Sequence, residues 1–151
     1  SMRPTLLEGD LILVNKFIYG AKVPFTKYRL PKLREPKRGD VIVFIYPEDK
    51  KKDFIKRLVG LPKDIIEIKS GTIYVNDEPL LDPVFRRYYY NRGDLAKEGE
   101  KIVVPENSFF VLGDNSGSSK DSRYWGFVPG DNILGKAIVI YWPPQRIRTI
   151  K

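Results

Sequence analysis

The 151-residue chain contains neither histidine nor cysteine. Without histidine, a Ser-His-Asp triad, a Cys-His pair and a histidine-ligated zinc site are excluded. Without cysteine, disulfides and thiolate metal sites are excluded, and either side of a membrane stays open as the working compartment. Acid–base chemistry in this protein must therefore use Lys, Asp, Glu, Tyr or a terminal amine.

The chain also lacks any run of about 18 apolar residues, so its sequence predicts no membrane-spanning helix, and it shows no signal peptide. The first residues are typical of structured sequence, and we therefore expect that an upstream segment has been removed. The net charge of +8 indicates an anionic partner, either nucleic acid or a lipid surface. No basic helix or zinc-finger spacing accompanies this charge, so nucleic-acid recognition has no motif behind it.

The length fits one domain that can bury a core. Short β-branched and aromatic runs, separated by Gly, Pro and Asp turns, predict an all-β fold with two antiparallel sheets. We expect a strand around Lys56 and others over residues 11–14 (continuing toward Tyr19), 41–46, 65–69, 72–75, 102–104, 108–112 and 133–142. Ser70-Gly71 predicts a hairpin turn, Gly135 predicts a bulge, and residues 20–37 are expected to form a long surface loop. We expect residues 1–75 and 102–151 to form the core and residues 76–101 to form an inserted subdomain.

Lys56 lies between apolar neighbours in the stretch that runs from Asp53 to Pro62. Burial disfavours the charged form of a lysine and lowers its pKa. A neutral lysine can then act as a general base near neutral pH. The alternative is an ordinary strand lysine that points to solvent, and the ambiguous alternation of this stretch leaves both interpretations open.

Residues 113–129 form the stretch that is richest in polar residues and glycine. This stretch is either a tight loop whose Asp and Ser side chains cap their own backbone, or a wall of hydroxyl and carboxylate groups that fixes a nearby amine. Asp121 can pair with Arg123 or with Arg57, and either pair would hold the loop rigid.

Taken together, these stretches resemble the sequence boxes of type I signal peptidases, which are membrane-bound Ser-Lys endopeptidases that remove secretory signal peptides. Ser1-Met2-Arg3-Pro4-Thr5-Leu6 resembles the nucleophile box, and residues 54–62 (FIKRLVGLP) resemble the general-base box. Gly113-Asp114-Asn115, with Ser119 and residues 121–129, resembles the last box. Residues 38–44 (RGDVIVF) add a weaker fourth match. The matches occur in the family's order and span nearly the whole chain.

The resemblance implies catalytic roles without a metal or a cofactor. Ser1 would be the nucleophile and Lys56 its neutral general base. Ser119 would orient the Lys56 amine, and Asp121, Arg123 and Arg57 would support the site. The pocket for the residue before the scissile bond would be lined by Met2, Leu6, Phe54, Ile55, Val111 and Leu112, and the next pocket by Ile12, Val43 and Asp53. Ordinary core packing is the alternative for each apolar member.

The resemblance also implies the partners and the location. The substrates would be signal peptides of secretory precursor proteins, cleaved after small residues, and no nucleic acid is expected. The catalytic domain would work on the extracytoplasmic side of the cell inner or plasma membrane. Family members carry one or two transmembrane helices before the nucleophile, so we expect this chain to be a soluble truncation. A membrane lipid surface would be a second partner, with Trp125, Trp142 and residues 88–90 as interfacial candidates.

Three alternatives remain open. Ser1 could be an N-terminal nucleophile that uses its own α-amine as base, which would make Lys56 dispensable. The chain could be a self-cleaving regulator of the repressor type, whose catalytic domain is similar, but such proteins lack the insertion at 79–99 and the sequence of residues 122–129. A basic β module that binds nucleic acid or an anionic membrane without catalysis would show salt-dependent binding that does not need Lys56.

Overall fold

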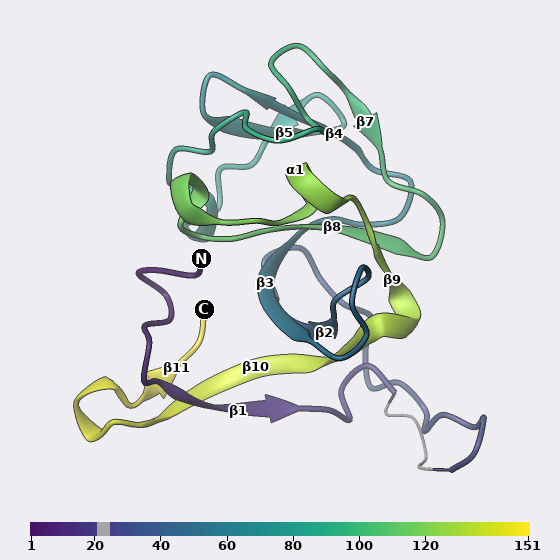
Figure 1. The fold of residues 1–151 in the computed structure, drawn as a ribbon, viewed down its shortest axis with the longest axis vertical. Helices are drawn as coiled ribbons and strands as arrows, with labels where there is room; N and C mark the ends of the chain where they lie inside the picture. Colours follow the sequence, from purple (N-terminus) through teal and green to yellow (C-terminus); the bar gives the residue numbers. More distant parts are fainter. Residues whose placement is uncertain (21–24) are drawn as a thin grey trace.

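The computed structural model describes residues 1–20 and 25–151, and it confirms the predicted all-β fold with two antiparallel sheets (Figure 1). The larger sheet has the strand order β1-β10-β2-β3-β8-β9, and β11 pairs with β10. Its strands are β1 (Leu11–Asn15), β2 (Val41–Ile45), β3 (Asp53–Gly60), β8 (Ser108–Leu112), β9 (Val128–Pro129), β10 (Ile133–Trp142) and β11 (Arg148–Thr149).

The smaller sheet has the order β6-β5-β4-β7 and consists of β4 (Ile65–Lys69), β5 (Thr72–Val75), β6 (Glu78–Pro79) and β7 (Ile102–Val103). In Figure 1 this sheet lies above β8, and the curled strands β2 and β3 lie between β8 and the β1–β10 pair. The predicted β4–β5 hairpin is confirmed by the pairing of Lys69 with Thr72. Ser70 and Gly71 both have positive φ, as a tight two-residue turn requires.

Two sequence expectations about strand shape have different outcomes. The bulge at Gly135 is confirmed, because the β10–β2 register shifts there and a Cβ would lie 2.5 Å from the carbonyl oxygen of Asn15. The continuation of the first strand toward Tyr19 is wrong. The side chain of Asn15 accepts hydrogen bonds from the backbone amides of Phe17 and Ile18 at 3.0 and 3.2 Å, which turns the chain out of the sheet.

The short elements were not expected from the sequence. They are β6, β9 and β11, the helix α1 (Ser122–Trp125) and the 3₁₀ turns η1 (Pro83–Phe85), η2 (Ser116–Ser118), η3 (Gly130–Asn132) and η4 (Pro144–Arg146). A two-residue strand or a single helical turn is too short to show a hydrophobic period. Residues 21–24 of the predicted surface loop lie outside the described residues. No helix in the described ranges is long and apolar enough to cross a membrane.

The core is divided into three clusters, and their positions decide which side chains surround the site. One cluster lies between the smaller sheet and β8, and it includes Phe85, Tyr89 and Ala96. These three residues belong to the segment 76–101, whose separation as an inserted subdomain stays a prediction. A second cluster lies on β2, β3, β8 and β10, and the third joins Met2 to Val41 and Ala137.

The pairing of β3 leaves part of one edge open. β3 pairs with β2 from Asp53 to Arg57, but it pairs with β8 only from Arg57 to Gly60. The backbone groups of Leu58 bond residues 39 and 40 on the β2 side. Because these groups alternate along an antiparallel strand, those of Asp53 and Ile55 point away from β2. Among the described residues, no strand covers this side of β3 before Arg57.

Candidate active site

Ser1 and Lys56 meet although they are far apart in sequence. The Lys56 Nζ donates a hydrogen bond to the Ser1 Oγ at 2.5 Å. The lysine is only 5% exposed, so it is not the solvent-facing strand lysine of the alternative interpretation. Lys56 lies on β3 opposite Ile42 of β2, on the face that also carries Phe54 and Leu58.

The surroundings of Lys56 favour its neutral form. Burial lowers the pKa of the amine, Asp121 partly opposes this by raising it, and Arg123 lowers it further. In the described part of the chain, no carboxylate forms an ion pair with the amine. The Phe54 ring lies 5.7 Å from Nζ. A lysine that is largely desolvated and unpaired is suited to accept a proton from a hydroxyl group.

Ser1 is held by the loop that follows β8. Its carbonyl oxygen accepts a hydrogen bond from the Asn115 amide at 2.7 Å. Gly113 permits this approach, because a Cβ there would lie 2.7 Å from the Ser1 carbonyl oxygen and would overlap the Ser119 side chain. The α-amine of Ser1 has its pKa lowered by burial and by the charge of Lys56.

Ser119 lies beside these residues but is not bonded to the lysine. Its side chain is buried, and its Oγ has no hydrogen-bond partner among the described residues. The expected hydrogen bond from Ser119 to the Lys56 amine is therefore not formed in this structure. Its orienting role stays a prediction.

Asp121 and Arg123 form one of the two predicted pairs. The Arg123 guanidinium donates to both Asp121 carboxylate oxygens, at 2.8 and 3.0 Å, and both side chains are completely buried. Arg123 also donates to the backbone carbonyls of Tyr90, Ser116 and Ser119. Asp121 accepts from the Gly113 amide at 3.0 Å and caps α1 through the Arg123 amide. This pair ties the 113–123 loop to itself.

The alternative pairing of Asp121 with Arg57 is wrong. Arg57 donates from Nε and Nη2 to the two carboxylate oxygens of Asp114, both at 2.8 Å. The Thr5 hydroxyl also donates to Asp114, and Arg87 lies 3.2 Å from the same carboxylate. Asp114 belongs to the last box but had no expected role, and the contacts of Thr5 and Arg87 with it were not predicted. The signal for an acidic partner was Arg57 itself. It follows Lys56 directly, so strand alternation places its side chain on the opposite face, where a buried guanidinium needs a carboxylate.

The predicted pocket residues do not all gather in one place. Met2, Leu6, Ile12 and Ile55 belong to the third core cluster, whereas Phe54 and Val111 belong to the second. Leu112 lies in the cluster beneath the smaller sheet, on the opposite face of β8 from Val111, so these two neighbours cannot line one pocket. Val43 is half-buried opposite Ile55, and Asp53 is exposed at the start of β3.

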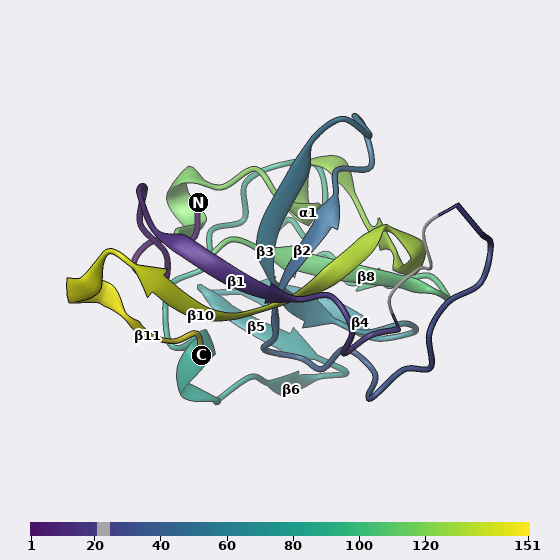
Figure 2. The same cartoon turned by 90° about the horizontal axis from the view of Figure 1, so that it is seen from below.

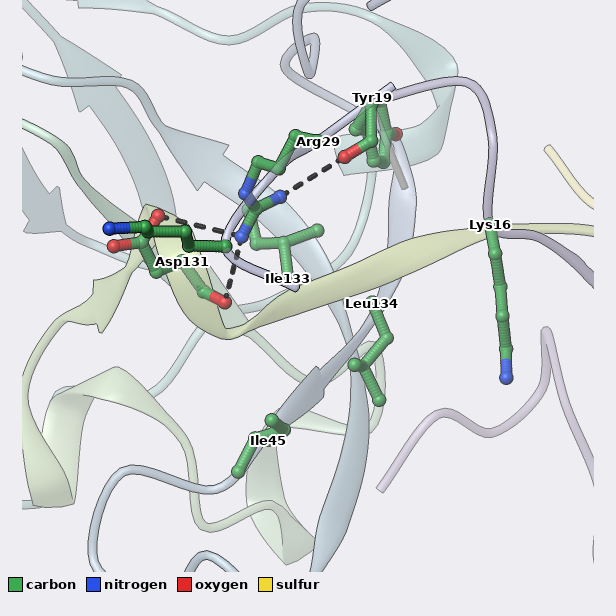
Figure 3. Close-up of a pocket in the computed structure, with 9 residues that line it drawn as sticks. Lys16, Tyr19, Arg29, Ile45, Asp131, Ile133 and Leu134 are labelled. Atoms are coloured by element: carbon green, nitrogen blue, oxygen red, sulfur yellow. Dashed lines mark hydrogen bonds and ion pairs between the residues drawn. The ribbon is translucent and has the colours of Figure 1, made fainter. Parts of the chain in front are cut away.

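Three cavities in the described part of the chain lie away from Ser1 and Lys56. One has a volume of about 480 Å³, and Figure 3 shows Ile45, Ile133 and Leu134 among the residues that line it. Across it Arg29 bonds the carbonyl and carboxylate of Asp131. A second of about 620 Å³ adjoins it, and a third of about 500 Å³ lies beside Pro4. None of the predicted site residues lines these three cavities. In the described ranges, no three His, Cys, Asp or Glu side chains are grouped as metal ligands.

Comparisons with known proteins agree with the resemblance. The model of the family "Signal peptidase, peptidase S26" matches residues 1–142. Signal peptidase I of Pseudomonas fluorescens is 35% identical over 182 residues, covering 97% of this chain and 64% of that protein. A probable signal peptidase I-2 of Synechocystis is 37% identical over 153 residues, covering 97% of this chain and 62% of that protein. The chain therefore spans less than two thirds of these relatives.

A solved structure shows the same relationship in three dimensions. The crystal structure of a signal peptidase I from Enterococcus faecalis superposes with a TM-score of 0.58 at 31% identity. The match covers 68% of this chain and 97% of the other.

Proposed function

Because the chain belongs to the signal peptidase S26 family, we propose that it is the catalytic part of a serine endopeptidase that removes signal peptides from secretory precursor proteins. Ser1 is the nucleophile and Lys56 its general base. The observation that carries this assignment is the 2.5 Å hydrogen bond between the buried lysine and the serine hydroxyl. With no histidine in the chain, a Ser-Lys pair is the available way to activate a serine.

In the proposed mechanism, neutral Lys56 accepts the Ser1 hydroxyl proton while Oγ attacks the scissile carbonyl carbon. The tetrahedral intermediate expels the amine of the downstream peptide, which takes the proton from the Lys56 ammonium. This leaves the upstream peptide as an ester on Ser1. Lys56 then deprotonates a water molecule, which attacks the ester carbonyl, and the departing Ser1 oxygen recovers the proton.

The open edge of β3 is the proposed binding site for the upstream part of the substrate. An extended peptide can pair with the backbone groups of Asp53 and Ile55, and this pairing brings it to Lys56 at the end of the edge. Phe54 lies on the Lys56 face of β3, and Ile55 lies on the opposite face with Met2. The preference for small residues next to the scissile bond rests on the family resemblance.

A lipid surface is the proposed second partner, on the extracytoplasmic side of the inner or plasma membrane. Leu11 and Leu13 are 48% and 52% exposed on one face of β1, and Trp142, which pairs with Leu11, is 53% exposed. Figure 2 shows β1 lying along β10 at this face. The prediction that Tyr89 is an interfacial residue is wrong, because its side chain is only 1% exposed. Trp125, another candidate, packs among the rings of Phe44, Tyr46 and Phe54.

The catalytic proposal is tested on a form extended upstream of Ser1, in detergent, with a peptide that carries an Ala-X-Ala cleavage site. Ser1→Ala and Lys56→Ala are expected to abolish cleavage while circular dichroism shows folded protein. Lys52→Ala is the matched control, because Lys52 is exposed just before β3. In the extended form the Ser1 nitrogen is part of a peptide bond, so it cannot replace Lys56 as the base. Normal cleavage by Lys56→Ala would therefore overturn the lysine's role.

Membrane binding is tested by liposome flotation. Wild type is expected to float with anionic vesicles, and the Leu13→Lys variant is expected to bind them less. Equal flotation of the two proteins would remove the β1–β10 face as the membrane surface.

A further inference from the structure

We propose that Tyr88, Tyr90 and Arg92 form a docking surface for an acidic segment of the substrate immediately downstream of the scissile bond. This inference rests on the proposed function, since it assigns the leaving part of the same substrate. These residues belong to the segment 76–101, to which the catalytic proposal gives no task.

The segment that carries the surface is fixed to the loop around Ser1. The Tyr90 amide donates to the Ser116 Oγ at 2.9 Å, and the Tyr90 carbonyl accepts from Arg123 at 2.7 Å. The amides of Asp94 and Leu95 donate to the Arg123 carbonyl at 2.7 and 2.8 Å. The surface is therefore held in place before a ligand arrives, which reduces the entropy lost on binding.

The docking surface lies close to the nucleophile in space. The Asn115 amide contacts the Ser1 carbonyl, and two residues further along, Gly117 faces the Tyr90 ring, where a Cβ would lie 3.5 Å from the ring. Two residues of chain span at most about 7 Å. Tyr90 is therefore reached by about the fourth residue of an extended peptide that starts at the Ser1 hydroxyl.

The open edge of β3 directs the downstream peptide toward this surface. β8 ends at Leu112 opposite Arg57, and the chain then leaves the sheet as the 113–119 loop. This loop lies at the Lys56 end of the open edge. A peptide whose upstream half lies along Asp53 and Ile55 meets the loop as it passes Ser1, and its downstream half continues past the loop toward Tyr90.

The chemistry of the surface suits carboxylates. Tyr88 and Tyr90 are 59% and 40% exposed, and their ring centroids lie 4.8 Å apart. The Arg92 guanidinium lies 4.6 Å from the Tyr90 ring centroid, a position that holds it in place. Among the described residues, Arg92 forms no ion pair, so its guanidinium can receive a carboxylate.

Two peptide substrates test the inference. They share the Ala-X-Ala site and differ only at the third and fourth downstream residues, which are Glu-Glu in one and Lys-Lys in the other. Wild type is expected to cleave the acidic peptide with a kcat/KM about five times higher, the upper range of one exposed charge pair. Arg92→Glu is expected to remove or invert this ratio. Lys97→Glu is the matched control, because Lys97 is exposed on the same segment and is expected to keep the wild-type ratio.

A binding measurement separates this inference from the proposed function. The labelled acidic downstream product peptide needs no catalysis, and its fluorescence anisotropy is expected to show weaker binding to Arg92→Glu than to wild type. If no peptide is cleaved but this difference in binding is seen, the proposed function fails and the docking surface stands. An unchanged ratio in Arg92→Glu, an equal effect of Lys97→Glu, or a loss of vesicle binding in Arg92→Glu without any effect on peptides would overturn the inference.

Discussion

Cleavage should be governed by the deprotonation of Lys56. Its side chain is 5% exposed, and burial lowers the pKa of its amine from the ordinary value of 10.5. Only the neutral amine can accept the Ser1 proton. We therefore expect kcat/KM to rise tenfold per pH unit and then to level off, with a midpoint below 10.5.

The size of the effect follows from what the substitution removes. A positioned general base contributes about 10²- to 10⁴-fold to a rate, so Lys56→Ala should lose at least this much in kcat. Lys56→Arg should be equally inactive, because arginine stays protonated throughout the accessible pH range. The assay is peptide cleavage from about pH 6 to about pH 11, a range that includes the ordinary pKa of lysine and several units below it.

The same titration affects stability, and its sign is fixed. Since the folded-state pKa of Lys56 is lowered, the unfolded chain binds the proton more tightly, and the native state gains stability as pH rises from the folded-state pKa to 10.5. For each pH unit in this window the gain is about 1.4 kcal/mol. Lys56→Met lacks this gain, so its free energy of unfolding in urea should rise less over the window than that of wild type. A cleavage midpoint at or above 10.5, or an unchanged profile in Lys56→Ala, would refute the reasoning.

Three further substitutions probe the loop that holds Ser1. Asp121→Asn leaves the Arg123 guanidinium buried without its counter-charge, so it should lower the free energy of unfolding by about 3–5 kcal/mol; a change below about 1 kcal/mol would contradict the burial argument. Gly113→Ala should push Ser119 aside and lower kcat at least tenfold with a smaller change in KM, and a wild-type kcat would show that the loop adapts freely. Thr5→Val removes a hydroxyl that donates to a buried carboxylate and should cost about 1 kcal/mol in urea unfolding; an unchanged stability would mean that the arginines alone satisfy that carboxylate.

The strands could be predicted because their signals are local, whereas the contact between Ser1 and Lys56 was expected from the family resemblance. The β4–β5 hairpin follows from two short alternating runs joined by Ser70-Gly71, and its register depends on nothing distant. The Ser1 and Lys56 boxes are recognisable stretches in a fixed order. By contrast, α1 is a single turn that exists because Asp121 caps it, and this helix has no periodic pattern to detect.

Pocket membership could not be predicted in the same way, because it depends on which face of a strand a side chain occupies. Val111 and Leu112 are neighbours of similar chemistry, yet they enter different core clusters. A shift of one residue in register reverses every such assignment. The hydrogen-bonding state of Ser119 depends on side-chain torsion and is not written in the sequence either.

The consecutive residues Lys56 and Arg57 lie on one strand but in opposite electrostatic surroundings, one without a paired counter-charge among the described residues and one with a carboxylate. Their side chains point to opposite faces because β3 alternates. On one face, the lysine is buried without an ion-pair partner in the described chain, which suits a neutral base. On the other face, Arg57 is 1% exposed, and Asp114 supplies its counter-charge by accepting hydrogen bonds from Nε and Nη2. Exchanging the two residues would bury an unpaired guanidinium beside Ser1 and leave Asp114 facing a lysine that cannot form the bidentate pair, so K56R/R57K should be both less stable and inactive.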